Sequence, residues 1–159
     1  MEVSTLVRRL VDAALAGRRD DQLFGLVCDD LLAHGVPILR AGMGAQFLHP
    51  ALEVRLLRWI CGRGVESETL GREPDDAPED EAWLASPFYQ LVKRQARMLR
   101  RRIDAVSIAE FPMLAEFAAM GGVDYVAMRQ PIGRGVAFGE GGPSLHFLGH
   151  RPRERVQRR

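Results

Sequence analysis

Apolar residues recur at helical spacing in two blocks near the beginning of the chain. Ser4 can cap a first helix, whose apolar positions lie three or four residues apart and which Gly17 ends. A second block begins near Asp20 or Asp21, whose carboxylates suit a helix N-terminus, and ends at Gly35. The pattern therefore predicts an N-terminal helix within residues 1–19 and a second helix. Both would either pack on a sheet or pair with the same helices of another copy.

The pattern then changes to strict alternation, which is typical of strands. One alternating run extends from Leu39 to His49, and a second extends from Glu53 to Arg63. The intervening His49-Pro50 turn makes an antiparallel hairpin the simplest interpretation. In the second strand one face is predicted to carry Arg55, Leu57, Trp59 and Cys61.

Residues 66–82 differ in kind from the segments on either side. Carboxylates stand here among Gly71, Pro74 and Pro78, with almost no apolar side chain to bury. Burial in such a segment is too small to offset the entropy of ordering it. We therefore expect a mobile acidic loop inside one domain that spans residues 1–159.

Helix and strand patterns alternate again in the second half of the chain. Residues 98–103 either prolong the preceding helix or form a short strand. Two further helices are expected, one opened by Ser86-Pro87 and one opened by Pro112 and stopped by Gly121-Gly122. A strand from Val123 to Met128 should follow, and then a closing hairpin of residues 136–139 with 144–149. Residues 151–159 are expected to form a loose basic tail. Together the elements predict an α+β fold with a central antiparallel sheet flanked by helices.

The composition and net charge of the chain argue against several classes of function. At 159 residues the chain has the size of one domain, and its net charge of +1 argues against a wholesale nucleic-acid or membrane binder. Cys28 and Cys61 do not form a CxxC pair, so no zinc or redox motif is indicated and a reducing cytoplasmic location is expected. We predict no signal peptide and no membrane anchor, because no apolar run approaches the ~20 residues that span a bilayer.

Six short motifs follow one another in a recognisable order. They are Leu48-His49-Pro50, Trp59 in the next strand, Ser86-Pro87-Phe88, Leu99 to Ile103, Phe111 to Leu114 and Gly121 to Met128. This series resembles the N-terminal sensory domain that precedes the catalytic domain in many proteobacterial class III adenylate/guanylate cyclases, a region similar to GAF and PAS domains. The likeness covers about residues 20–150 and favours a strand at 98–103.

The resemblance implies a non-enzymatic regulatory module. The chain departs from the family at Met128 to Pro131, which is less apolar than usual, and it ends before a cyclase catalytic domain could begin. The implied role is a cytoplasmic GAF/PAS-like sensory domain that binds a small ligand of unknown identity. It would relay the signal, as a homodimer, to a cyclase catalytic domain in the same or another chain, with no nucleic-acid or membrane partner. The alternative is a dimerisation or docking module without a small-molecule ligand.

Four aromatic residues are the candidates for lining a ligand pocket. Phe47, Trp59, Phe88 and Tyr125 would meet between sheet and helices if the fold is GAF-like. The competing interpretation, which is favoured for large aromatic side chains, is that they fill the core.

Two further groups of residues are candidate sites. His49 and Cys61 are better explained as a turn residue and a small buried hydrophobe than as metal ligands, so no metal site is predicted. The basic cluster Lys93, Arg94, Arg97, Arg100, Arg101 and Arg102 suits phosphate oxygens, yet it lacks interleaved aromatic residues. A solvated or internally paired face is the preferred interpretation of this cluster.

Overall fold

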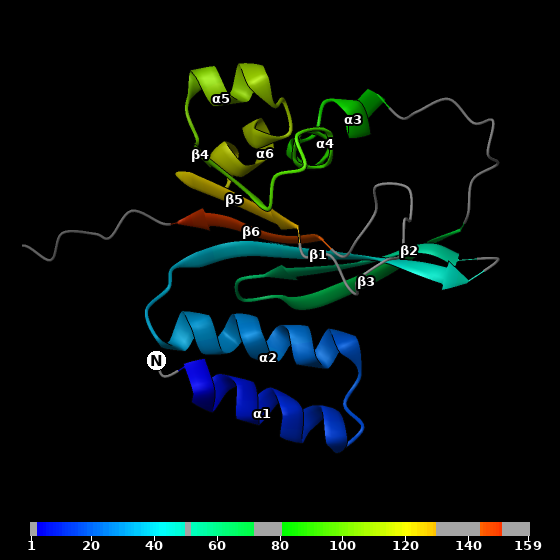
Figure 1. Cartoon of the computed structure of the whole chain (residues 1–159). Helices are drawn as coiled ribbons and strands as arrows, with labels where there is room; N and C mark the ends of the chain where they lie inside the picture. Colours follow the sequence, from blue (N-terminus) through cyan, green and yellow to red (C-terminus); the bar gives the residue numbers. More distant parts are fainter. Residues whose placement is uncertain (1–2, 50–51, 72–80, 130–143, 151–159) are drawn as a thin grey trace, which may run out of the picture.

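A six-stranded antiparallel sheet forms the centre of the protein in the computed structural model (Figure 1). The model describes residues 3–49, 52–71, 81–129 and 144–150, with side chains over 3–44, 55–69 and 81–129. The strand order is β3-β2-β1-β6-β5-β4. The strands are β1 (Ile38–His49), β2 (Leu52–Ile60), β3 (Gly64–Gly71), β4 (Met98–Arg102), β5 (Asp124–Arg129) and β6 (Ser144–His150). The predicted α+β class with a central antiparallel sheet is confirmed.

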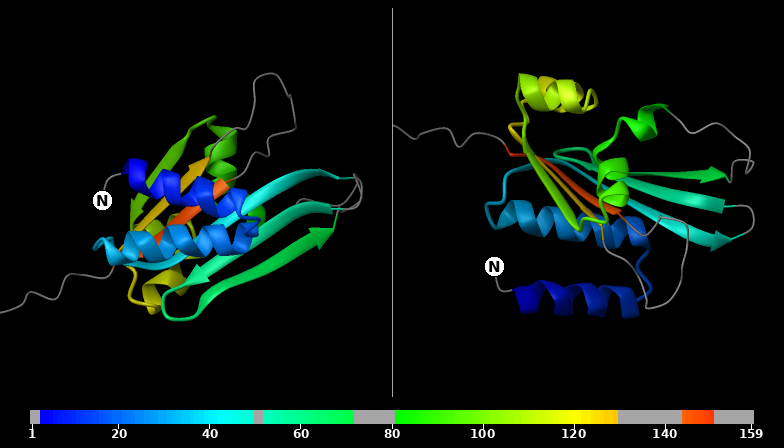
Figure 2. Two further views of the ribbon diagram at one scale, coloured as in Figure 1. Left: turned by 90° about the horizontal axis from the view of Figure 1, so that it is seen from below. Right: turned by 45° about the horizontal axis from the view of Figure 1, so that its top comes forward.

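Helices lie on both faces of this sheet (Figures 1 and 2). On one face, α2 packs against β1, β2 and β3, and α1 packs against α2. On the other face α4 packs against β4 and β5, with α3 beside α4 and α5 beside α6. The helices are α1 (Val3–Leu15), α2 (Asp20–Ala33), α3 (Glu81–Leu84), α4 (Pro87–Lys93), α5 (Ala105–Glu110) and α6 (Leu114–Ala119).

Each face of the sheet has its own hydrophobic core. Trp59 pairs with Ala41 across β2 and β1, and both pack beneath α2 against Phe24 and Cys28. The opposite core contains Phe88, Leu91, Leu99, Phe111, Leu114, Phe117, Tyr125 and Ala127. Burying one large apolar side chain contributes roughly 1.5–3 kcal/mol, so both cores stabilise the fold substantially. Because successive strand residues point to opposite faces, the sheet keeps the two cores apart.

Local signals fix several element ends as the sequence predicted. Ser86 caps α4, where its hydroxyl accepts a hydrogen bond from the Tyr89 backbone N–H at 3.1 Å, and Pro87 occupies the first turn. Gly121 comes directly after the C-cap of α6 and has a φ of 84°, a conformation that glycine adopts without strain. The hairpin of β1 with β2 and the short strand β4 are likewise confirmed.

The predicted acidic loop at 66–82 was wrong over its first part. Residues Gly64–Gly71 form β3, an edge strand that pairs with β2, and α3 begins at Glu81. Val65 packs against the core beneath α2, while Glu66 points outward and its carboxylate lies 3.9 Å from Arg58. Charged side chains are tolerated at a sheet edge because one side of the strand remains in water. Residues 72–80 of the expected loop lie outside the described residues.

Two other sequence predictions differ from the structure or cannot be compared with it. Helix α5 was not expected, although Asp104 and Ser107 form a reciprocal capping box at its beginning. Strand β6 pairs with both β1 and β5, so it lies inside the sheet. The expected partner strand at 136–139 and the basic tail at 151–159 lie outside the described residues.

Candidate ligand-binding groove

The four aromatic residues predicted to line one pocket do not come together. Trp59 is buried in the core beneath α2, whereas Phe88 and Tyr125 are buried in the core on the opposite face of the sheet. Phe47 lies in β1, but its side chain is outside the described part of the chain. A shared pocket is therefore wrong for Trp59, Phe88 and Tyr125, because the sheet separates them. These three side chains fill the cores.

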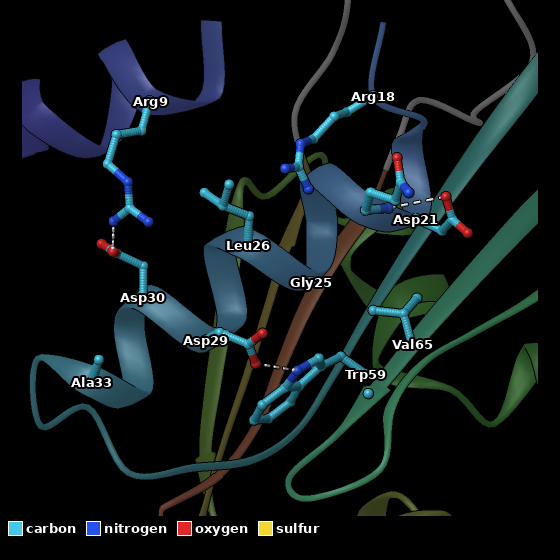
Figure 3. Close-up of a pocket in the computed structure, with 12 residues that line it drawn as sticks. Arg9, Arg18, Asp21, Gly25, Leu26, Asp29, Asp30, Ala33, Trp59 and Val65 are labelled. Carbon is cyan, nitrogen blue, oxygen red and sulfur yellow. Dashed lines mark hydrogen bonds and ion pairs between the residues drawn. The ribbon is translucent and has the colours of Figure 1, made fainter. Parts of the chain in front are cut away.

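A groove of about 650 Å³ opens instead beside Trp59, on the face that α1 and α2 cover (Figure 3). One wall comes from α2, a second from β2 and β3, and α1 with the loop after it contributes the rim. Gly25 lets α2 lie close to β3, since a Cβ at this position would be 3.2 Å from Val65 Cγ2. The lining residues are Arg9, Arg18, Asp21, Gln22, Gly25, Leu26, Asp29, Asp30, Ala33, Trp59, Gly64 and Val65.

Trp59 and Asp29 lie side by side in the lining of this groove (Figure 3). The Trp59 side chain is 2% exposed, and its indole Nε1–H donates a hydrogen bond of 2.9 Å to Asp29 Oδ1. A buried indole N–H needs such an acceptor, and the bond fixes the orientation of the carboxylate. The hydrogen bond therefore holds an indole and a carboxylate next to each other beside the groove (Figure 3).

Asp30 joins the two helices at one end of the groove. The Asp30 side chain is only 7% exposed, and its carboxylate forms an ion pair with Arg9 of α1. His34 Nδ1 lies 3.6 Å from Asp30 Oδ2 and 2.8 Å from the Asp30 backbone oxygen. Because a carboxylate this deeply buried needs a charged or hydrogen-bonding partner, the pair ties the position of α1 to α2.

The opposite rim carries a cation that is open to a ligand. The Arg18 side chain projects over the groove in Figure 3, and within the described parts of the chain its guanidinium has no ion-pair partner. Nearby, Arg19 hydrogen-bonds Asp21 at 2.7 Å and holds the pKa of that carboxyl below its ordinary value. Asp21 is thus already neutralised, and Arg18 remains available for an anionic group.

Another ion pair beside the groove makes the free energy of unfolding depend on pH in the acid range. The Arg55 guanidinium hydrogen-bonds Asp20 and lowers the pKa of that carboxyl, against an opposing effect of partial burial. A depressed folded-state pKa gives a stabilisation that is present above the unfolded pKa of about 3.9 and is lost as the pH falls through the folded value.

We therefore expect Asp20→Asn to flatten the pH dependence of the unfolding free energy below about pH 4. The effect should not exceed about 1 kcal/mol, because the Asp20 side chain is 43% exposed. Urea unfolding at a series of pH values measures it. Arg55→Gln should flatten the same acid range, and an unchanged slope in both variants would contradict the assignment.

Metal and thiol chemistry find little support in the described residues. No group of three histidine, cysteine, aspartate or glutamate side chains among them is arranged to hold a metal ion. Burial raises the pKa of the Cys28 thiol to about 12, so the thiol stays protonated and unreactive at neutral pH. Cys61 packs against the core beneath α2, and the side chain of His49 lies outside the described part of the chain. None of the described helices is long and apolar enough to cross a membrane.

Comparison with known proteins gives no match from which the ligand of this groove could be inferred. No protein-family model and no curated protein sequence matches the chain. The groove must therefore be interpreted from its own residues.

The basic cluster predicted from the sequence is partly paired inside the fold. Arg100 Nε lies 2.9 Å from Asp124 Oδ2, and Arg101 Nε lies 2.8 Å from Glu110 Oε2. These partners come from β5 and α5 rather than from the acidic segment. An internally paired face is thus correct for these two arginines, which are no longer free to bind phosphate.

Sequence reasoning missed the charged residues of the groove. Asp29 and Asp30 interrupt the apolar pattern of α2, and an adjacent acidic pair in the middle of a core helix was a usable signal. Arg18 gave no signal, because an arginine after a helix stop is ordinary. What brings them together is the approach of α2 to β2 and β3, which is a tertiary feature.

Proposed function

We propose that this protein is a non-catalytic, GAF/PAS-like sensory or regulatory domain that binds a small ligand in the groove beside Trp59. The observation that carries the proposal is the groove itself, which is lined by the hydrogen-bonded Trp59 and Asp29 and by Arg18, an arginine without an ion-pair partner among the described residues. Such a concave site with a few converging polar groups is the usual form of a small-molecule site. The ordered motifs and the antiparallel sheet with helices on both faces also support it.

The chemistry of the groove selects a ligand class. Arg18 provides a cation for a carboxylate or phosphate, while Asp29 can accept a hydrogen bond from an amine, amide or hydroxyl group. The ligand is thus a small polar molecule with an anionic end and a donor group. Its body would lie along Leu26 and the part of the Trp59 indole that lines the groove.

A relay follows from the position of the groove. The lining comes from α1, α2 and two strands, and the Arg9–Asp30 pair sets how α1 lies on α2. A ligand that binds one arrangement of the two helices better than another shifts the population toward it. The signal would then pass through α1, in a cytoplasmic homodimer, to a cyclase catalytic domain in the same chain or another chain.

A docking module without a ligand is the second candidate. It is favoured by one observation, the large exposed apolar side chains of α1, which include Val3 at 66% and Leu15 at 83% exposure. Under this alternative the groove binds nothing, and the protein acts through partners of α1. A ligand-binding experiment therefore separates the two functions.

Trp59 provides the reporter for that experiment. Trp83 is 42% exposed on α3, so Trp83→Phe leaves Trp59 as the sole tryptophan at little structural cost. In this variant we would follow fluorescence and the melting temperature while adding ATP, cyclic AMP, glutamate, citrate and haem. We expect one of the anionic probes to change the emission of Trp59 and to raise the melting temperature.

Charge variants then locate the bound probe. Arg18→Gln should weaken binding by roughly tenfold or more, because a charge-assisted hydrogen bond contributes about 1.5–3 kcal/mol. Arg102→Gln, an exposed arginine on β4, is the matched control and should bind like the parent. The sensory proposal fails if no probe in an extended metabolite panel binds, or if Arg18→Gln leaves the affinity unchanged.

A further inference from the structure

Helix α1 is apolar over a wider arc than α2 covers. Leu6 is 9% exposed and faces α2, but Val7 and Val11 remain about half exposed, at 51% and 50%. These two valines lie in one row with Val3 and Leu15, each four residues from the next. We call Val3, Val7, Val11 and Leu15 the α1 stripe. Residues four apart on a helix form a continuous ridge, so the stripe is a surface suited to another helix.

An apolar hollow continues this stripe toward the sheet. It measures about 470 Å³ and lies between α1, α2 and β1. Apart from Asp20, all its lining residues are apolar, namely Leu10, Val11, Ala14, Leu23, Phe24, Val27 and Met43. The α1 stripe and the hollow form one apolar surface, because Val11 belongs to both. Contiguous apolar surface of this kind marks an interaction site more often than isolated exposed residues do.

The charges beside the stripe identify its partner. Arg8 and Asp12 are both exposed, and they follow Val7 and Val11 by one residue on the same flank. The flank therefore carries a positive charge and a negative charge one helical turn apart. When two such helices pack antiparallel around a two-fold axis near their centre, the charged flank of one helix lies against the same flank of the other. The two flanks run in opposite directions. Arg8 then lies near Asp12 of the partner subunit. In a parallel pair related by a two-fold axis the two charged flanks would lie on opposite sides of the contact, so these ion pairs could not form.

We propose that the α1 stripe is the interface of a homodimer, in which α1 packs antiparallel against α1 of a second copy. Reciprocal Arg8–Asp12 ion pairs flank the apolar contact and select the antiparallel orientation. The inference deepens the proposed function, since it names the surface of the homodimer through which the relay would pass. Four apolar side chains cover less than the roughly 800 Å² per partner of a standard interface, so the dimer is expected to dissociate on dilution.

The interface also has a route to the ligand groove. Arg9, which follows Arg8, holds buried Asp30 at one end of the groove. A shift of α1 at the dimer contact therefore changes the geometry of the groove rim, and binding in the groove shifts α1 in return. By linkage, a groove ligand that changes the dimer affinity must have its own affinity changed by the same factor.

Sedimentation velocity over a concentration series tests the interface with the full chain. The wild-type protein should show a monomer–dimer equilibrium. Val11→Asp should abolish the dimer across the same range, because it places two carboxylates in an apolar contact. The matched control is Val106→Asp on α5, where the valine is 78% exposed on the opposite face of the sheet. That variant should dimerise like the wild type, and circular dichroism should show both variants folded.

A charge exchange tests the antiparallel orientation. Arg8→Asp and Asp12→Arg each place like charges opposite one another twice in the dimer, and each should weaken dimerisation by roughly tenfold. The double variant Arg8→Asp/Asp12→Arg restores both pairs with reversed sign, and it should recover most of the wild-type affinity. Recovery is the result that a merely structural effect of either residue would not give.

The outcomes separate the interface from the ligand. A monomeric wild-type protein, a dimeric Val11→Asp variant or a double variant as weak as the singles would each overturn the α1 interface. Ligand binding by the Trp83→Phe variant would stand in all three cases, so the sensory proposal would survive. A dimer that follows the charge exchange but binds no probe would support the interface and overturn the ligand.

Discussion

Replacing Trp59 with alanine is expected to lower the free energy of unfolding by about 3–5 kcal/mol, the larger of two effects that the cores predict. Trp59 is 2% exposed, lies opposite Ala41 in the sheet and packs beneath α2. Its removal leaves a cavity under α2 and leaves Asp29 without its indole donor. Urea denaturation followed by far-ultraviolet circular dichroism measures the change.

Two further variants distinguish the effect of burying the Trp59 side chain from the effect of its hydrogen bond to Asp29. Trp83→Ala removes the same side chain from an exposed site on α3 and should cost no more than about 1 kcal/mol. Trp59→Phe keeps most of the packing but loses the hydrogen bond to Asp29, so it should cost about 1–3 kcal/mol. Equal stabilities of Trp59→Ala and Trp83→Ala would show that Trp59 does not fill the core beneath α2.

Leu114→Ala is expected to cost about 2–5 kcal/mol through the core on the other face of the sheet. Leu114 is 0% exposed and packs among Phe88, Phe111 and Tyr125, where no solvent can fill the space that the leucine leaves. Thermal and urea unfolding measure the loss. Leu32→Ala is the matched control, because Leu32 is 37% exposed on α2 and should cost less than about 1.5 kcal/mol.

The same variant reports on the function. The sheet separates Leu114 from the groove, so the folded fraction of Leu114→Ala should bind a groove ligand with unchanged affinity. Mutations at distant positions without shared partners act independently to within a few tenths of a kcal/mol. A large loss of affinity in a folded Leu114→Ala protein would mean that the ligand sits on the α4–α6 face instead.

Several elements could be predicted because short-range interactions determine them. The cap at Ser86 with Pro87 opens α4, and Gly121 supplies the left-handed residue before β5. The predicted face of Arg55, Leu57, Trp59 and Cys61 also holds, since Leu57, Trp59 and Cys61 pack beneath α2 and Arg55 pairs with Asp20. In each case the deciding residues lie within one turn or one strand of each other.

Local sequence patterns could not show whether the aromatic residues share one pocket. Trp59 and Tyr125 both look like inward-facing strand residues, and period-two alternation states that each has a buried face. It does not state which face of the sheet is inward for each strand. Because helices cover both faces here, both residues are buried and yet lie in different cores. The groove beside Trp59 was missed for the same reason, since Arg18, Asp29 and Val65 meet only after α2 packs on the sheet.

The sequence by itself determined the α+β class, the first hairpin and some helix ends, such as the beginning of α4 and the glycine after α6, because caps, glycines and alternation act between near neighbours. Ser4, which was expected to cap the first helix, lies inside α1 instead. Only the tertiary structure decided that β6 lies between β1 and β5, and that the acidic residues after Gly64 begin an edge strand. It also decided which core each aromatic residue joins and that half of the apolar face of α1 is left uncovered. These outcomes depend on strand register and helix docking between residues far apart in the sequence. Many tertiary arrangements are compatible with the same local propensities, so local patterns do not decide among them.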